Sequence, residues 1–170
     1  MASASERKKD ARGRHLPHAG RVSAAFRALV VDDEPGLRLL LERVLERAGG
    51  RVTAVATLPE ARDWIDAVDV IVCDYRLARG VSGADVVRAA QEKLGALAPP
   101  AILVTATPED VTEEELGLFA DWIAKPFRPQ AIVDRVRVVL AGRRARQASG
   151  TEPRPDAETV PAPERAGGED

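Results

Sequence analysis

Five short, nearly continuous apolar runs recur along this chain, and each is followed by a segment with helical spacing. The runs are residues 28–31, 51–55, 68–73, 101–105 and 121–124. Runs of this kind are typical of strands buried on both faces, which occur in parallel sheets covered by helices. The alternation therefore constrains the fold to a layered α/β arrangement.

The segments between the runs carry the helix signals that this arrangement needs. After the first run, Pro35 stands near the start of an apolar i, i+3, i+4 pattern and Gly49 marks its end. Thr57 and Glu60 form a capping-box pattern that opens a second helix, which we expect to continue to Ile65. The later helices are expected from Ser82, as a short acidic helix within residues 110–119, and from Ile132 to Leu140.

The expected fold is a flavodoxin-like doubly wound (βα)₅ sandwich, because right-handed crossovers place helices on both faces of a parallel sheet. We expect a five-stranded sheet in the order 2-1-3-4-5. It would occupy residues 27–142. Residues 1–26 form a basic leader and residues 143–170 a tail rich in proline and acids, and neither can bury enough apolar surface to order itself.

Bulk composition predicts a cytoplasmic location. Cys73 is the one cysteine, so an intrachain disulfide is impossible and a reducing compartment fits. No apolar stretch approaches the roughly 20 residues that span a bilayer, and the charged start lacks a secretion signal. The basic leader has no aromatic residue before Phe26 at its end and no helical moment, so we expect neither direct DNA binding nor membrane binding.

Polar residues fall where the predicted strands end. Asp32 and Asp33 follow the first strand, Asp74 follows the third, Thr105 ends the fourth and Lys125 follows the fifth. The carboxyl ends of parallel strands share one edge of the sheet, where ligands bind. The second strand ends without a charge, and in the expected order it lies at the outer edge. We therefore expect the five side chains to converge.

Convergence of three carboxylates has a chemical consequence, because like charges held close together repel. A divalent cation relieves this repulsion, and oxygen ligands with room for water suit Mg²⁺. Lys125 and Thr105 would add a cation and a hydroxyl donor able to hold phosphoryl oxygens. One carboxylate would remain to act as a nucleophile, as in aspartyl phosphates. The residues thus indicate a Mg²⁺-dependent phosphoryl acceptor.

Four segments in order, VVDDEP, IVCDYRL, ILVTAT and WIAKPF, resemble the signatures of response-regulator receiver domains of two-component signalling. The resemblance covers about residues 27–142. It implies that Asp74 is the phosphoacceptor for a phosphohistidine on a sensor histidine kinase or phosphotransfer protein. It also implies that Asp33 binds Mg²⁺ directly, Asp32 binds it directly or through water, and Asp74 and the backbone carbonyl of Arg76 complete the protein ligands.

The resemblance assigns the remaining motif residues as well. Thr105 would hydrogen-bond the phosphoryl group and Lys125 would pair with it. The peptide bond before Pro126 would be cis. Trp122 stands at the switch-aromatic position and would follow Thr105 inward on phosphorylation. The fourth helix, fifth strand and fifth helix would form the surface that a downstream protein target reads, and dimerisation through it is left open.

This sequence departs from the family pattern at several places. Ala78 replaces the usual proline after the phosphoacceptor, and the loop 78–83 is one residue longer than the commonest form. Tryptophan replaces the more usual tyrosine or phenylalanine at 122, and core packing is the alternative interpretation of this side chain. Arg76 and Thr107 occupy positions that tune phosphate lifetime in the family.

Three functions compete at this point. The first is a single-domain response regulator, which promotes its own phosphorylation and dephosphorylation but is not otherwise an enzyme, and which signals by protein–protein interaction or phosphorelay. The second is a degenerate receiver that acts as a protein-binding module. The third is a haloacid-dehalogenase-like phosphatase, although that fold needs a DxD spacing after the first strand, where this chain has Asp32-Asp33-Glu34. No output domain is expected after residue 142.

Overall fold

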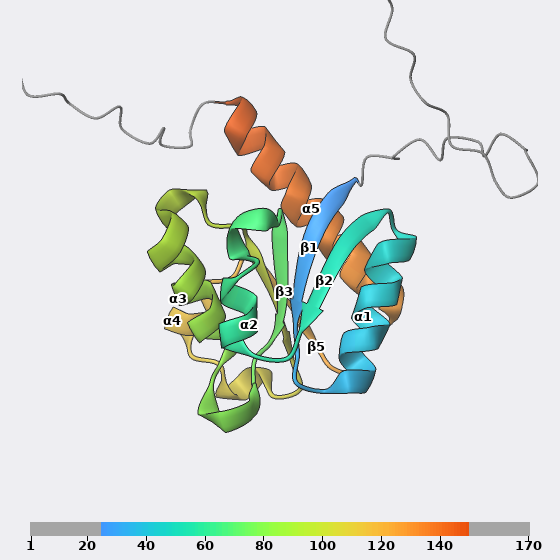
Figure 1. The fold of residues 1–170 in the computed structure, drawn as a ribbon, viewed down its shortest axis with the longest axis vertical. Coiled ribbons are helices and arrows are strands. Elements are labelled where there is room, and N and C mark those ends of the chain that lie inside the picture. Colours follow the sequence, from blue (N-terminus) through green and yellow to red (C-terminus); the bar gives the residue numbers. More distant parts are fainter. Residues whose placement is uncertain (1–24, 150–170) are drawn as a thin grey trace, which may run out of the picture.

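The computed structural model describes residues 25–149, which form a five-stranded parallel sheet with helices on both faces (Figure 1). The strand order is β2-β1-β3-β4-β5, as predicted. The strands are β1 (Phe26–Val31), β2 (Gly50–Val55), β3 (Val70–Asp74), β4 (Ala101–Thr105) and β5 (Asp121–Ala124). The helices are α1 (Pro35–Arg47), α2 (Leu58–Arg62), α3 (Gly83–Leu94), α4 (Glu113–Leu116) and α5 (Pro129–Ala148).

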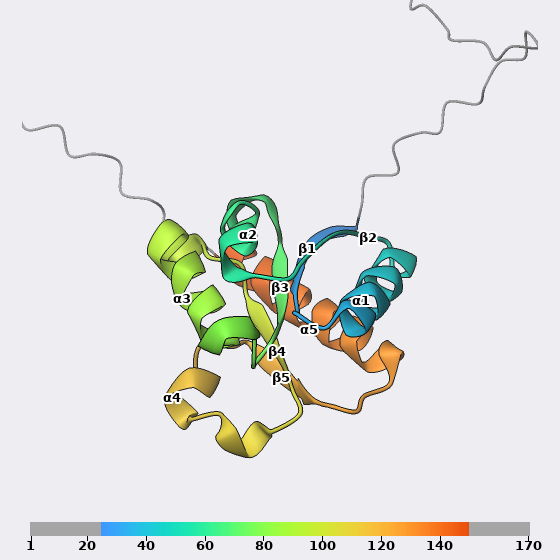
Figure 2. The ribbon, with the colours of Figure 1, turned by 60° about the horizontal axis from the view of Figure 1, so that its bottom comes forward.

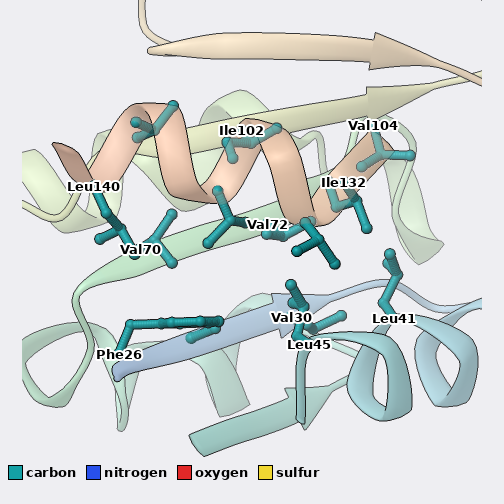
Figure 3. Packing of buried hydrophobic residues seen from close by; sticks show 14 of the residues in the cluster. Phe26, Val30, Leu41, Leu45, Val70, Val72, Ile102, Val104, Ile132 and Leu140 are labelled. Atoms are coloured by element: carbon teal, nitrogen blue, oxygen red, sulfur yellow. The ribbon is translucent and has the colours of Figure 1, made fainter. Parts of the chain in front are cut away.

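Two apolar layers hold the sandwich together, one on each face of the sheet. Helices α1 and α5 cover one face, while α2 and α3 cover the other (Figure 2). Figure 3 shows the first layer, where Val30 and Val72 of the sheet lie among Leu45 of α1 and Ile132 of α5. Each such fully buried aliphatic side chain contributes about 1.5–3 kcal/mol. The runs that form β1, β3 and β4 are buried on both faces, whereas the edge strands β2 and β5 are only partly buried.

Local signals start and stop the helices largely as predicted. The capping box of Thr57 and Glu60 is present, and Ser82 caps α3. Gly49 ends the α1 segment with a φ of 92°, a conformation that favours glycine. The second helix is shorter than predicted: α2 ends at Arg62, and a separate 3₁₀ turn follows at Ile65–Ala67.

Strand β1 begins one residue before, and helix α5 ends six residues after, the predicted range of 27–142. Phe26 belongs to β1 and its ring is buried in the α1/α5 layer. Helix α5 continues to Ala148, because Arg143 donates to the carbonyl of Asp69 and Arg144 to that of Ala25. These bonds tie the last turns to the sheet.

The remaining predictions for the two ends of the chain, a disordered leader and a disordered tail, concern residues 1–24 and 150–170 and lie outside the described residues. Between residues 25 and 149, no helix has the length and apolar character needed to cross a membrane.

Candidate functional site

The predicted site residues meet at one edge of the sheet. Strand register aligns the ends: Val31 pairs with Cys73, Asp74 with Val104, and Thr105 with Ala124. The residues at or just after these strand ends therefore share the lower edge of the sheet in Figure 1. All the strand ends that the sequence singled out contribute to this site.

Three carboxylates form the centre of the site. One oxygen from each of Asp32, Asp33 and Asp74 lies within 4.8 Å of the others. Asp32 is fully buried, Asp74 is partly buried and Asp33 is exposed. Burial raises the pKa of Asp32, and the hydrogen bond from the Glu34 N–H and the charge of Lys125 only partly oppose this.

The two oxygens of Asp32 have different surroundings. Oδ1 accepts a hydrogen bond of 2.8 Å from the backbone N–H of Glu34. Oδ2 is buried and has no hydrogen-bond partner within residues 25–149. Lys125 Nζ lies 3.6 Å from this oxygen, an ion-pair distance that does not amount to a hydrogen bond. A buried carboxylate oxygen without a donor is costly unless a ligand completes its coordination.

Lys125 supplies the positive charge of the site. Its Nζ lies 2.9 Å from Oδ1 of Asp74, and its side chain is only 20% exposed. The backbone N–H of Lys125 donates to the carbonyl of Thr105 at 2.7 Å, which fixes the start of the loop after β5. The Lys125–Pro126 peptide bond is cis, which confirms what the resemblance implied.

Thr105 places a hydroxyl at the same edge. The residue is buried, and its Oγ1 accepts a hydrogen bond of 3.1 Å from the backbone N–H of Thr107. The hydroxyl proton has no acceptor among the described residues, so it is available to a ligand. A role for this hydroxyl in holding a phosphoryl group stays a prediction.

The structure shows the positions of Trp122 and Arg76, but it does not test the roles predicted for them. Trp122 lies on β5 opposite Leu103 and is 40% exposed, so it is not a core-packing residue. Its switching stays a prediction. Arg76 forms an isolated bridge with Ser82 through its backbone, and its side chain pairs with Asp110. A metal-ligand role for the Arg76 carbonyl also stays a prediction.

Two residues that support the site were missed by sequence reasoning. Gly83 lies so close to the Asp74 segment that an added Cβ would be 2.5 Å from the Asp74 carbonyl oxygen. A glycine at the first turn of α3, directly after the cap Ser82, was the available signal. Tyr75 donates its hydroxyl to Glu115 of α4, a contact between residues 40 positions apart for which the sequence carries no pattern.

The donor set fits a small divalent cation. Three carboxylates converge, one of them with a buried oxygen that lacks a donor within residues 25–149, and only oxygen ligands are present. Hard cations such as Mg²⁺ take oxygen ligands and usually retain several waters, which the exposed side of Asp33 would admit.

Comparison with known proteins agrees with this geometry. The family model of the response regulator receiver domain matches residues 28–137. This chain belongs to that family. The match favours the receiver interpretation over a haloacid-dehalogenase-like phosphatase, and all the site residues described above lie inside the matched range.

Curated relatives of this receiver domain are regulators of greater length. It is 35% identical over 132 residues to the C4-dicarboxylate transport transcriptional regulatory protein DctD of Pseudomonas aeruginosa, covering 71% of this chain and 26% of that protein. It is 37% identical over 126 residues to the transcriptional regulatory protein ResD of Bacillus subtilis, covering 71% and 50%. The chain thus spans a quarter to a half of the length of these relatives.

Solved receiver structures have the same fold. A receiver domain from Clostridium thermocellum superposes with a TM-score of 0.62 at 18% identity, over 70% of this chain and 97% of that one. The response regulator TrrA of Thermotoga maritima, solved with Mg²⁺ and beryllium fluoride, gives a TM-score of 0.59 at 25% identity, over 66% and 97%.

Proposed function

We propose that this receiver accepts a phosphoryl group on Asp74, in a Mg²⁺-dependent reaction, from a phosphohistidine of a sensor histidine kinase or phosphotransfer protein. One observation carries the proposal. Lys125 Nζ lies 2.9 Å from Asp74 Oδ1, at the same edge of the sheet as the three-carboxylate cluster. Among these carboxylates, Asp74 combines a direct lysine partner with partial exposure, which a nucleophile needs to reach a donor.

The metal would be held by Asp32, Asp33 and Asp74, with the carbonyl of Arg76 as a further ligand. When bound, Mg²⁺ supplies the positive charge that offsets the clustered carboxylates and polarises phosphoryl oxygens. The Mg²⁺–beryllium fluoride complex of the Thermotoga relative supports this assignment.

The residues of this chain would then share the work of transfer. A carboxylate oxygen of Asp74 attacks phosphorus while the phosphorus–nitrogen bond of the donor breaks, and the imidazole leaves with the bonding pair and takes up a proton. Lys125 would pair with the transferred group, which carries a charge of about −2. The buried hydroxyl of Thr105 would donate its free proton to another phosphoryl oxygen.

Output would be a phosphorylation-dependent contact with a downstream protein or a phosphorelay step. The surface that would carry it is α4, β5 and α5, where Trp122 is exposed. The curated relatives are named as transcriptional regulators. For this chain, we propose a cytoplasmic regulator that promotes its own phosphorylation and dephosphorylation and signals through contact with another protein.

The experiment uses the full chain and phosphoramidate, a small donor with a phosphorus–nitrogen bond. Measurement of the intact mass after incubation with Mg²⁺ should show one phosphoryl adduct. Alkali should remove this adduct, and EDTA added before the donor should prevent its formation. Asp74→Asn should abolish the adduct. Asp134→Asn, an exposed position on α5, is the matched control and should behave like the wild type. An adduct on Asp74→Asn would refute Asp74 as the acceptor.

A further inference from the structure

The two residues directly after Asp74 reach across to the segment between β4 and β5. The hydroxyl of Tyr75 lies 2.9 Å from Oε2 of Glu115 and 3.1 Å from the carbonyl oxygen of Asp110. The guanidinium of Arg76 pairs with the carboxylate of Asp110. Consecutive residues of the phosphoacceptor loop thus hold both the 3₁₀ turn Pro108–Asp110 and helix α4.

Tyr75 is the fixed side of this contact. Its N–H donates to the carbonyl of Val104 at 2.9 Å, and its carbonyl accepts from the N–H of Gly83 at 2.8 Å. Its backbone is therefore bound both to the central sheet and to the start of α3. The phenol reaches out from a rigid base, so the element whose position it sets is α4.

Helix α4 depends on outside support. It has four residues, all exposed or only partly buried, and a helix this short has little stability of its own. Figure 2 shows it at the periphery of the molecule. Oε2 of Glu115 accepts from the N–H and the hydroxyl of Thr112 in a capping box, and the same oxygen accepts from Tyr75. The cap and the docking of α4 therefore share one carboxylate oxygen.

We infer that Tyr75 and Arg76 are positioning residues that couple the phosphorylation state of Asp74 to the placement of α4, by a route separate from Thr105 and Trp122. The inference rests on the proposed phosphorylation of Asp74.

Charge supplies the coupling. The Arg76 side chain is 68% exposed, and a phosphoryl group on Asp74 would bring about two negative charges two residues away. That group competes with Asp110 for the guanidinium. When Arg76 turns toward it, the 3₁₀ turn loses its ion pair, and the hydrogen bonds of the Tyr75 hydroxyl to Glu115 and to the Asp110 carbonyl then contribute more to the docking of α4.

The test compares the wild type with Tyr75→Phe, which removes one hydroxyl and keeps the ring. Hydrogen exchange of residues 108–119 is measured in the full chain with Mg²⁺, before and after addition of beryllium fluoride as a phosphoryl mimic. Loss of one hydrogen bond should make exchange in the free variant about fivefold faster. The further increase caused by beryllium fluoride should be at least about twice the wild-type increase, because in the variant no Tyr75 hydroxyl holds α4 once Arg76 turns away from Asp110.

Two more variants ensure that the test does not depend on Tyr75→Phe alone. Asp110→Asn breaks the Arg76 pair in advance, so this variant should show a reduced response of α4 to beryllium fluoride. Glu114→Gln is the matched control: it removes an equivalent charge from α4, but this side chain is exposed and has no partner among the described residues. Its response should equal that of the wild type.

The affinity for beryllium fluoride is a second readout, and a purely structural role of Tyr75 in holding α4 would leave it unchanged. If Asp74 and α4 are coupled, Tyr75→Phe must change the affinity for beryllium fluoride, because a substitution that shifts the placement of α4 then also shifts binding of the mimic at Asp74. Mimic binding with the same affinity and the same α4 response in wild type and Tyr75→Phe would overturn the coupling alone. Failure of the wild type to bind the mimic would overturn the proposed function and the coupling with it.

Discussion

Lys125 Nζ lies 2.9 Å from Oδ1 of Asp74 and 3.6 Å from Oδ2 of Asp32, so one ammonium group serves two carboxylates from different strands. The ammonium group therefore lies beside the position that a phosphoryl group on Asp74 would occupy. This arrangement also means that the lysine and a bound metal ion would act on the same cluster of negative charge.

Replacing Lys125 by methionine should therefore have two opposite effects. Without Mg²⁺, the free energy of unfolding should fall by about 1–3 kcal/mol, because buried carboxylate charge loses its partner. The affinity for Mg²⁺ should rise, because a competing cation is gone. Urea unfolding in EDTA and a Mg²⁺ titration by tryptophan fluorescence measure these effects.

Lys93→Met is the matched control for that variant. Lys93 also makes a 2.9 Å ion pair, with Asp66, but on an exposed surface where such pairs contribute about 0–1 kcal/mol. It should leave Mg²⁺ affinity unchanged. Equal Mg²⁺ affinity in wild type and Lys125→Met would show that the lysine does not act on the carboxylate cluster.

Asp32→Asn should stabilise the metal-free protein, by about 1–2 kcal/mol. The reason is that burial raises the pKa of Asp32 despite the nearby lysine, so the ionised form costs folding free energy at neutral pH. The variant should also lose most of the stabilisation that Mg²⁺ confers. Urea unfolding with EDTA and with Mg²⁺ separates the two effects.

The exposed neighbour of Asp32 provides the comparison. Asp33→Asn should lose the Mg²⁺ stabilisation in the same way but leave stability in EDTA nearly unchanged, because its charge is already solvated. A metal-free Asp32→Asn protein that is less stable than the wild type would contradict our account of the buried oxygen.

Gly83 should tolerate no side chain. In Gly83→Ala the Cβ would lie 2.5 Å from the Asp74 carbonyl oxygen and 3.2 Å from Sγ of Cys73, so the backbone must shift, at a cost of about 1–3 kcal/mol. Gly36→Ala, on α1, meets nothing within 4 Å and should stabilise the protein by about 0.5–1 kcal/mol. Thermal unfolding of both variants checks the contrast, and similar shifts in both would refute the close approach.

Asp69 should support the fold only above acidic pH. Partial burial alone would raise its pKa, but hydrogen bonds and charge from Arg27, including a 2.9 Å ion pair, lower the pKa overall. A carboxylate with a lowered folded-state pKa stabilises the protein above its unfolded pKa and loses that effect as pH falls through the folded value. The stability difference between wild type and Asp69→Asn should thus be constant from about pH 7 to pH 5 and shrink below about pH 4.

Urea unfolding across that pH range measures the difference, which should be about 1 kcal/mol or less at neutral pH because the pair is partly exposed. Asp63→Asn is the control, since Asp63 is an exposed carboxylate on the surface and its replacement should change the free energy of unfolding little. A difference that grew on acidification would contradict the assigned sign.

Much of the site could be predicted from the sequence, because each of its polar residues stands at or directly after the end of an apolar run that marks a strand. Asp74 and Lys125 meet because the strands are parallel and follow the order that is common in doubly wound sheets. Apolar runs and caps carry that information locally, which is why the sheet order and the carboxylate cluster were both predicted correctly.

Contacts between loops could not be predicted in the same way. The bond from Tyr75 to Glu115 depends on how the connection after β4 folds, and no periodicity describes a 3₁₀ turn followed by one turn of helix. The extension of α5 to Ala148 depends on Arg143 and Arg144 finding backbone carbonyls of distant segments. Trp122 stayed ambiguous because an apolar residue on an edge strand fits both a buried and an exposed position.

The most direct test of the central claim is to locate the phosphoryl group on the chain. Borohydride reduces an aspartyl phosphate to homoserine, which peptide mass spectrometry detects at a single position. After incubation with Mg²⁺ and phosphoramidate, we expect homoserine at position 74 and at no other aspartate. Homoserine at position 32 or 33, or none in a protein that binds Mg²⁺ and takes up phosphate, would contradict the assignment of Asp74 as the phosphoacceptor.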